Sequence, residues 1–353
     1  MPRSHDSTTG GRILRWSRLP DLPDPLGVAG PYVGSHRGAV VVAGGANFPT
    51  EPGGDRWVAP KVWLDRVWVL APDDAGGRAW HAEHPLPRPM GYGATVSTPQ
   101  GVVCIGGEDG RRIFADVVLL AWEPLARRLD RHHLPPLPMP LAFGAAATIG
   151  SAIYVVGGQH DLGRPPSEAV GYRLDLTGFE PGDQPRDWER LPDVPGGPRL
   201  VPVAVVRPDE AGPRLCVMSG RRTATTGVAE TMEMLRDVHE FDPAAGCWRR
   251  LADMPAARMA GAAVAVSPTW VAVLAGDDGR LAAQTASLKD DHPGFSRTCL
   301  VYDADDDAWT TADETPTCQL ATTLAPWEGG CVMVSGEIRP RARTPAAWLI
   351  ETA

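Results

Sequence analysis

Val40 to Gly45 has the sequence VVVAGG, and the chain repeats this pattern five more times. Each copy is an apolar run that ends in small residues: VVCIGG at 102–107, IYVVGG at 153–158, LCVMSG at 215–220, VAVLAG at 271–276 and VMVSG at 332–336. Successive copies end 62, 51, 62, 56 and 60 residues apart. A period of this length suits a four-stranded blade with variable loops, so the repeat predicts a β-propeller.

Each unit contains further strand signals after the small pair. A second apolar run follows a loop, as in 116–119 and 237–241, and a strand marked by tryptophan comes next. The tryptophans are Trp80, Trp188, Trp248 and Trp309. A new apolar run then begins the next unit, so every unit supplies the strands of one antiparallel sheet.

The two ends of the chain complement each other. Residues 13–20 read as the outermost strand of a blade with nothing before it, and residues 346–350 read as a third strand with nothing after it. We therefore predict an all-β, six-bladed propeller of the kelch type, in which the N-terminal strand completes the last blade and leaves no open sheet edge. The predicted organisation is a flexible tail over 1–11 and a single propeller domain over 12–353.

Composition and charge limit the possible partners. The 353 residues include 39 glycines and 36 prolines, yet 43% are apolar, which is typical of a folded protein rich in turns. The net charge is −9 and no block of basic residues occurs, so nucleic acid is not an expected partner. The uncharged segment 141–158 is interrupted by Gly150-Ser151, which indicates a strand hairpin and not a membrane span.

The expected location is the cytoplasm. The polar start of the chain lacks the apolar stretch of a secretory signal. The six cysteines are scattered, without a CxxC pair or a histidine at metal-site spacing, which fits reduced thiols and predicts no metal site. The oligomeric state has no signal in the sequence.

The residue after each small pair should occupy an equivalent place around the propeller axis. These residues are Ala46, Glu108, Gln159, Arg221, Asp277 and Glu337. Five of the six are polar, for which ordinary solvated loops are the default explanation and a wet central mouth is the alternative. The loops that follow are uneven, and the long ones over 46–62, 221–236 and 277–297 carry aromatic residues such as Phe48, Trp57 and Phe295. This unevenness favours a mouth with a partial lid.

The segment SGEIRPRART, at 335–344, is the strongest candidate for chemistry. It places Glu337 and Arg343 six positions apart around a bend that contains Pro340, so both side chains could be directed at one ligand. A carboxylate can accept a proton, and the planar guanidinium pairs with both oxygens of a carboxylate ligand.

Three motifs carry a family resemblance. The small pairs and spaced tryptophans resemble the kelch repeat over nearly the whole chain. GGANFP at 44–49, HPGF at 292–295 and GEIRPRART at 336–344 resemble the N-acetylneuraminate epimerase (sialic acid mutarotase) family. Because GGANFP opens this chain and GEIRPRART closes it, the likeness is to a cyclically permuted branch. The resemblance covers about residues 12–351.

The resemblance implies functional residues at matching positions. The family's catalytic glutamate and arginine match Glu337 and Arg343. The residues implied in substrate binding are Arg88, Tyr92, Arg199, Glu108 and Asn47. For Arg88 and Arg199 a structural role, in which a Pro-Arg pair ties neighbouring blades, is an equal alternative.

The implied activity is interconversion of the α and β anomers of a sialic-acid-like sugar. This reaction needs a base for the anomeric hydroxyl and an acid for the ring oxygen, so no metal or redox cofactor is expected. The expected partner is a small sugar acid. The alternative is a non-catalytic kelch propeller that binds a protein or glycan. A galactose-oxidase-like copper enzyme would need tyrosine, histidine and cysteine ligands in a setting that Cys247 and Cys299 do not provide.

Overall fold

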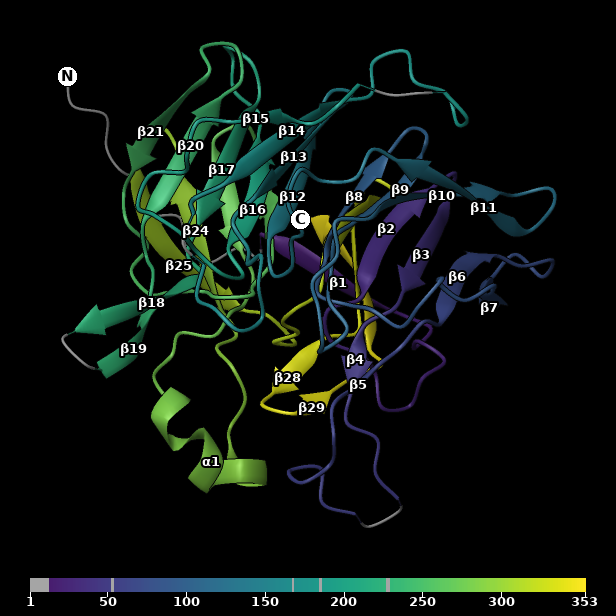
Figure 1. Ribbon diagram of the computed structural model, residues 1–353, viewed down its shortest axis with the longest axis horizontal. Helices are drawn as coiled ribbons and strands as arrows, with labels where there is room; N and C mark the ends of the chain where they lie inside the picture. Colours follow the sequence, from purple (N-terminus) through teal and green to yellow (C-terminus); the bar gives the residue numbers. More distant parts are fainter. Residues whose placement is uncertain (1–12, 52–53, 167, 184–185, 227–228) are drawn as a thin grey trace.

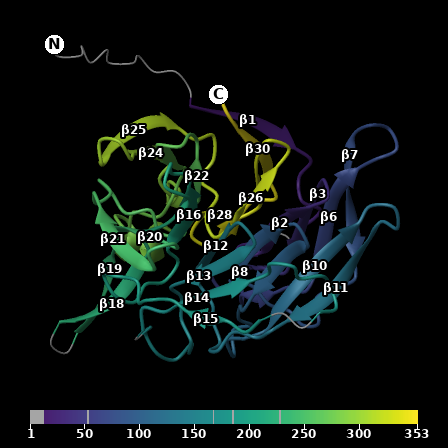
Figure 2. The same ribbon diagram turned by 90° about the horizontal axis from the view of Figure 1, so that it is seen from above.

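Six four-stranded antiparallel sheets surround one axis (Figures 1 and 2). The computed structural model describes residues 13–51, 54–166, 168–183, 186–226 and 229–353, without the side chains of 224–230. The predicted fold class, an all-β six-bladed propeller, is confirmed. The predicted tail over 1–11 lies outside the described residues.

The first three blades follow one another along the chain, each built from the inner to the outer strand. They consist of β2 (Tyr32–His36), β3 (Ala39–Ala43), β6 (Val67–Pro72) and β7 (Arg78–Glu83); of β8 (Ala94–Thr98), β9 (Gly101–Ile105), β10 (Val117–Glu123) and β11 (Arg128–Leu134); and of β12 (Ala145–Ile149), β13 (Ala152–Val156), β14 (Gly171–Asp175) and β15 (Glu189–Arg190).

The other three blades are built in the same way. They consist of β16 (Val203–Arg207), β17 (Arg214–Met218), β20 (Val238–Asp242) and β21 (Cys247–Leu251); of β22 (Ala263–Ala265), β23 (Trp270–Val273), β24 (Thr298–Asp303) and β25 (Ala308–Glu314); and of β26 (Leu324–Trp327), β27 (Gly330–Val334), β30 (Ala347–Thr352) and β1 (Leu14–Leu19).

Several short elements follow the small pairs and gather on one face of the ring (Figure 1). They are the two-stranded ladders β4 (Ala46–Asn47) with β5 (Val62–Trp63), β18 (Arg221–Thr226) with β19 (Ala229–Met234), and β28 (Glu337–Arg339) with β29 (Ala342–Arg343), and the helix α1 (Thr285–Leu288) between the 3-10 turns Ala282–Gln284 and Lys289–Asp291.

The ring is closed by the two ends of the chain. Strand β1 pairs with β30 over six residues, from Leu14 opposite Thr352 to Leu19 opposite Ala347. Figure 2 shows these two strands side by side. The prediction that the N-terminal strand completes the last blade is therefore confirmed, and this pairing protects the outer edge of β30.

The uncharged segment 141–158 forms the hairpin of β12 and β13, as predicted from Gly150-Ser151. Ala145 pairs with Val156 and Ile149 pairs with Ala152, so the turn falls at the expected residues. In the described part of the chain, no helix has the length and apolar character needed to cross a membrane.

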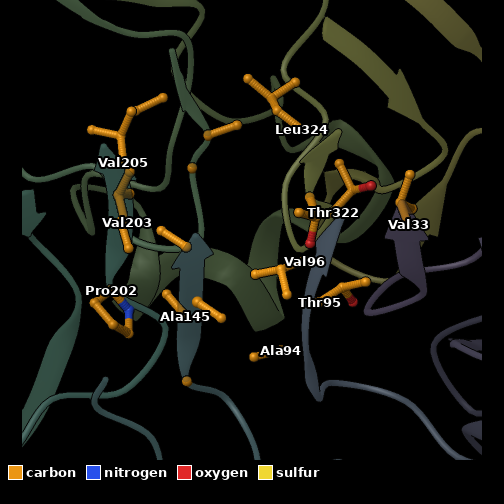
Figure 3. Close-up of a pocket in the computed structure, with 18 of the residues that line it drawn as sticks. Val33, Ala94, Thr95, Val96, Ala145, Pro202, Val203, Val205, Thr322 and Leu324 are labelled. Carbon is orange, nitrogen blue, oxygen red and sulfur yellow. The ribbon is translucent and has the colours of Figure 1, made fainter. Parts of the chain in front are cut away.

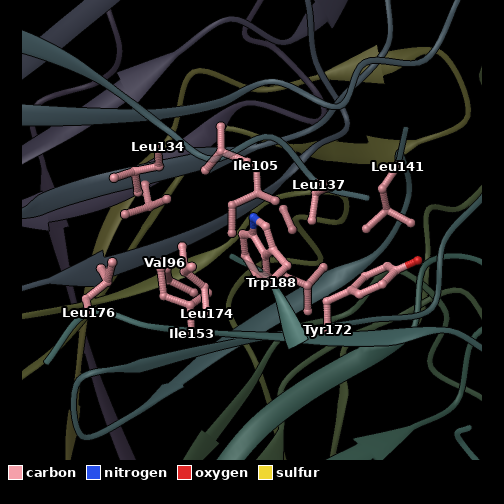
Figure 4. Packing of buried hydrophobic residues seen from close by; sticks show 14 of the residues in the cluster. Val96, Ile105, Leu134, Leu137, Leu141, Ile153, Tyr172, Leu174, Leu176 and Trp188 are labelled. Atoms are coloured by element: carbon pink, nitrogen blue, oxygen red, sulfur yellow. The ribbon is translucent and has the colours of Figure 1, made fainter. Parts of the chain in front are cut away.

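The hydrophobic core lies in layers between neighbouring blades. Along β9, Val103 and Ile105 pack toward the third blade, whereas Val102 and Cys104 pack toward the first. Both faces of each second strand are therefore buried, and this explains why these strands read as continuous apolar runs. Figure 4 shows the layer between the second and third blades, where Trp188 lies among Ile105, Leu137 and other aliphatic side chains.

The tryptophans that mark the outer strands connect each blade to the preceding one. Their indole N–H groups donate to backbone carbonyls just beyond the neighbouring outer strand: Trp80 to Pro20 (2.9 Å), Trp188 to Pro135 (2.9 Å), Trp248 to Pro192 (3.0 Å) and Trp309 to Ala252 (2.8 Å). The spaced tryptophan of the repeat thus has a structural cause, because it supplies both apolar area and a hydrogen bond between blades.

Replacing Trp309 with phenylalanine should lower the free energy of unfolding by about 1 kcal/mol, because the aromatic contact with Tyr302 is kept while the hydrogen bond to Ala252 is lost. Urea unfolding measures the change. Trp270→Phe is the matched control, since Trp270 is 40% exposed and bonds to Asp303 within its own blade. Equal stability of wild type and Trp309→Phe would contradict a role for this bond.

A closed belt of backbone hydrogen bonds surrounds the axis just before the inner strands begin. Each belt residue donates its N–H to the carbonyl of the equivalent residue in the preceding blade, over 2.6–3.0 Å. All of them have positive φ, between 46° and 67°. The belt residues are Gly30, Tyr92, Phe143, Val201, Ala260 and Ala321. The belt fixes the inner ends of all six blades relative to one another.

Candidate active site

The six residues that follow the small pairs occupy equivalent places, as predicted. Each one forms an isolated β-bridge with the residue just before the belt: Ala46 with Ala29, Glu108 with Gly91, Gln159 with Ala142, Arg221 with Leu200, Asp277 with Met259 and Glu337 with Leu320. Side chains from different blades are thereby placed at one level around the axis.

The long loops beside this level contact one another. Arg341 donates from Nε to the carbonyl of Arg56 (2.8 Å), and its guanidinium lies 3.8 Å from the ring centroid of Phe48. Asp290, next to α1, accepts a hydrogen bond from the indole of Trp57 (3.1 Å) and pairs with Arg56 (3.2 Å). Loops of the first, fifth and sixth blades therefore form a joined wall on the face that carries α1 and β28–β29.

Glu337 and Arg343 face each other across the β28–β29 ladder. Arg343 donates from Nη1 to Oε1 of Glu337 (3.0 Å), and the backbone N–H of Arg341 donates to the same oxygen (2.7 Å). No described residue bonds to Oε2. The Glu337 side chain is 22% exposed and that of Arg343 is 4% exposed, so the carboxylate is held on one oxygen and free on the other.

Electrostatics favour a proton-accepting role for this carboxylate. Burial raises the pKa of Glu337 above its usual value, while Arg343 and the backbone N–H of Arg341 oppose the rise. A carboxyl with a raised pKa is a stronger base than an ordinary surface glutamate, and such perturbed groups gather at functional sites.

A second carboxylate, Glu108, lies in the same region. It is 2% exposed and accepts a hydrogen bond from the indole of Trp63 (2.9 Å). The ammonium of Lys61 is 3.7 Å from its Oε1. Burial raises the pKa of Glu108, and Lys61 opposes the rise. The substrate-binding assignment of Glu108 thus falls on a residue with little exposed surface.

Tyr92 contacts both ion pairs, Glu337 with Arg343 and Glu108 with Lys61. Nζ of Lys61 lies 3.8 Å from the Tyr92 ring centroid, and Arg343 interacts with the Tyr92 side chain. Burial raises the pKa of Tyr92 above its usual value, and the charge of Arg343 opposes this. We call Lys61, Tyr92, Glu108, Glu337 and Arg343 the charged cluster.

Asn47 lies beside the belt and does not belong to the charged cluster. Its side chain is 4% exposed and donates to the carbonyl of Gly27 (3.3 Å). This hydrogen bond anchors the segment that leads into the first inner strand.

Arg199 and Arg88 each pair with an aspartate, which fits the structural alternative for the two Pro-Arg pairs, and their part in substrate binding stays a prediction. Arg199 is 1% exposed and forms a bidentate pair with Asp237, at 2.7 and 3.2 Å. Arg88 pairs with Asp116 at 3.2 Å and stacks on Phe114. Both aspartates stand just before the third strand of a blade, so these arginines tie the linkers between blades to the sheets.

Sequence reasoning did not single out Lys61 and His292 as site residues. Lys61 enters the charged cluster from the far end of the β4–β5 loop, and His292 interacts electrostatically with Asp277. Burial raises the pKa of Asp277, with a smaller opposing contribution from His292. Among the described residues, no three His, Cys, Asp or Glu side chains come together as metal ligands would.

A cavity of about 360 Å³ lies along the axis on the strand side of the belt (Figure 3). Its wall consists of small and aliphatic side chains from all six inner strands, such as Val33, Val96 and Val203. Apart from Tyr92 and Cys331, none of the lining residues is titratable. The carboxylates, the lysine and the arginine of the charged cluster therefore do not belong to the wall of this cavity.

Comparison with known proteins gives sequence relatives that share one name. N-acetylneuraminate epimerase of Brucella suis is 36% identical over 130 residues, which are 33% of this chain and 32% of the relative. The protein of the same name from Yersinia enterocolitica is 24% identical over 243 residues, covering 61% of this chain and 56% of the relative. The matches thus span about a third to somewhat over half of these relatives. No family model matches the chain.

The structural comparison covers the whole propeller. The solved structure of YjhT matches with a TM-score of 0.65 at 14% identity, over 95% of this chain and 97% of that chain. At this identity the likeness concerns the fold alone. The resemblance expected from the sequence is confirmed: this chain is a six-bladed propeller with sequence relatives named N-acetylneuraminate epimerase.

Proposed function

We propose that this protein interconverts the α and β anomers of a sialic-acid-like sugar by general acid–base catalysis. The observation that carries the proposal is the Glu337 carboxylate, which is fixed through Oε1 by Arg343 and Arg341 and whose Oε2 has no partner among the described residues. The names of the sequence relatives support the same substrate class.

The chemistry requires only proton movements. A base removes the proton from the anomeric hydroxyl, the bond between the anomeric carbon and the ring oxygen breaks, and the ring oxygen takes up a proton. The product is the open-chain ketone. Rotation next to the carbonyl and the reverse steps then close the ring on the other face. In this proposal, Oε2 of Glu337 takes the hydroxyl proton and returns it when the ring closes.

Arg343 has two tasks in this proposal. It holds Glu337 in position, and its guanidinium attracts the carboxylate of the sugar acid, which is a natural ligand for that group. Its Nε is buried and has no hydrogen-bond partner in the described part of the chain.

Replacing Arg343 with methionine should move the acidic limb of the pH–rate profile to higher pH. Arg343 lowers the pKa of Glu337, so its loss raises that pKa, and the deprotonated base is then present only at higher pH. The rate should fall as well. The profile of anomer exchange from pH 4 to 9 measures both effects, and Arg66→Met, at a 58% exposed arginine, is the matched control. An acidic limb at the wild-type position would contradict the electrostatic coupling.

The proposal is tested by dissolving a single anomer of N-acetylneuraminate and following its approach to equilibrium by NMR. The protein should shorten the time that this sugar acid needs to reach anomeric equilibrium. It should leave that time unchanged for an aldohexose, which has no carboxylate. A propeller that only binds a partner would retain the sugar or a protein without changing the approach to equilibrium, and that result would reject the proposed catalysis.

A further inference from the structure

We infer that Lys61 is the second proton-transfer group of the charged cluster and delivers the proton to the ring oxygen when the sugar opens. This inference rests on the proposed function. Glu337 accounts for the base, whereas the proposed reaction also needs an acid, and Lys61 is the group in the charged cluster best placed to be that acid.

The geometry holds the Lys61 ammonium between aromatic faces and carboxylates. Nζ lies 3.8 Å from the ring centroid of Tyr92, 4.6 Å from that of Trp63 and 3.7 Å from Oε1 of Glu108. The Lys61 side chain is 27% exposed, so it is held by these neighbours and only partly covered. Contact with the ring faces fixes the amine without using all its N–H groups.

The charged groups around Lys61 set its proton affinity. Burial lowers the pKa of Lys61 to about 8; Glu108 and Glu337 act to raise it, and Arg343 adds to the lowering. With this pKa the amine is mostly protonated at pH 7, and it is a stronger acid than an ordinary lysine. A group whose pKa lies near the working pH is suited to donate and recover a proton.

Lysine and arginine differ in this position. Only Lys61 and Lys289 are lysines, and the other 32 of the 34 basic residues are arginines. A guanidinium does not release its proton at these pH values, whereas a buried lysine readily does. A cation that only paired with Glu108 would not need to be a lysine.

The proton balance closes over one turnover. On ring opening, Lys61 gives a proton to the ring oxygen and Glu337 takes one from the anomeric hydroxyl. On ring closure, the hydroxyl formed from the ring oxygen returns its proton to Lys61 as it attacks the carbonyl carbon. Glu337 then protonates the carbonyl oxygen, so both side chains regain their starting states.

The first test is the alkaline limb of the pH–rate profile for N-acetylneuraminate anomer exchange. The wild type should lose rate as the pH rises through about 8, since the acid form of Lys61 disappears. Lys61→Arg keeps the positive charge but should lower kcat at least tenfold and abolish this limb. Lys289→Arg, at the exposed second lysine, is the matched control and should behave like the wild type.

The second test observes the amine itself. With only two lysines, ¹³C-labelled lysine side chains give two sets of NMR signals, and the set missing from Lys61→Arg assigns Lys61. Its titration should have a midpoint near pH 8. Glu108→Gln removes a carboxylate that raises this pKa, so the midpoint and the alkaline limb should move together to lower pH.

The outcomes separate this inference from the proposed function. Wild type that does not accelerate exchange rejects the proposed function. Suppose instead that the wild type accelerates exchange in a way that depends on Glu337, while Lys61→Arg keeps kcat and the alkaline limb. That combination rejects only the role of Lys61. A variant with raised KM and unchanged kcat would make Lys61 a binding residue and would likewise overturn the inference.

Discussion

Replacing Glu337 with glutamine should lower the protein-dependent rate of anomer exchange by about 10²–10⁴-fold, the range typical of a lost general base. Glutamine keeps an oxygen that can accept the hydrogen bonds from Arg343 and the backbone of Arg341, so the β28–β29 ladder should remain in place. It cannot take up the hydroxyl proton. The loss should therefore appear in kcat, with KM changed much less.

The matched control for this variant is Glu314→Gln. Glu314 lies on the outer strand of the fifth blade, outside the charged cluster; it is 60% exposed and pairs with Arg297. Both variants should unfold at the wild-type urea concentration. If Glu337→Gln retained the wild-type rate, Glu337 would have no part in the mechanism.

The largest effect on stability is expected for Arg199→Met. It leaves the Asp237 carboxylate without its bidentate partner in a position where the side chain is only 16% exposed. Breaking a buried ion pair in this way costs about 3–5 kcal/mol. Urea unfolding at pH 7 measures the loss, while the exchange rate per folded molecule should be unchanged because Arg199 lies outside the charged cluster.

Arg250→Met gives the comparison for an ion pair that is exposed on both sides. Arg250 is 64% exposed and its partner Asp253 is 43% exposed, so the removal of Arg250 should lower the free energy of unfolding much less than the removal of Arg199. A small stability change in Arg199→Met together with a raised KM for the sugar would contradict the structural role and restore Arg199 as a binding residue.

The stability lost in Arg199→Met should depend on pH in a defined direction. Burial acts to raise the pKa of Asp237, but hydrogen bonds from His239 and Arg199 outweigh it and hold the pKa well below its usual value. A depressed carboxyl pKa contributes stability that is fully present above the unfolded value of about 4 and is lost as the pH falls toward the folded value. The gap between wild type and variant should therefore shrink below pH 4.

The fold could be predicted from the sequence because the features that indicate it are local in the chain. The apolar second strands are recognisable because both of their faces are covered by neighbouring blades, so they carry no alternation. The unpaired strand signals at 13–20 and 346–350 were sufficient to predict the pairing of β1 with β30. The proximity of Glu337 and Arg343 could be predicted from the sequence, because the two residues are only six positions apart around one bend.

The rest of the site depends on contacts between distant segments. Lys61 and Glu108 are 47 positions apart in the chain and come together only in the folded protein. The packing of the loops also places Lys61 over the ring of Tyr92. The only sequence feature that could have indicated a role for Lys61 is the rarity of lysine in an arginine-rich chain. Arg199 follows a proline, and a Pro-Arg pair at this place in the repeat fits a ligand-binding residue and a structural link between blades equally well. Asp237, the aspartate just before the third strand, is the sequence feature that favours the structural link.

Mutarotase activity is measured most directly by NMR magnetisation transfer between the α and β anomers of N-acetylneuraminate at equilibrium, recorded at increasing wild-type protein concentration. The exchange rate should rise in proportion to the protein concentration, with a slope that Glu337→Gln reduces about 10²–10⁴-fold, and that dependence would establish catalysis through this carboxylate. An exchange rate equal to that of buffer at every concentration of folded protein would contradict it.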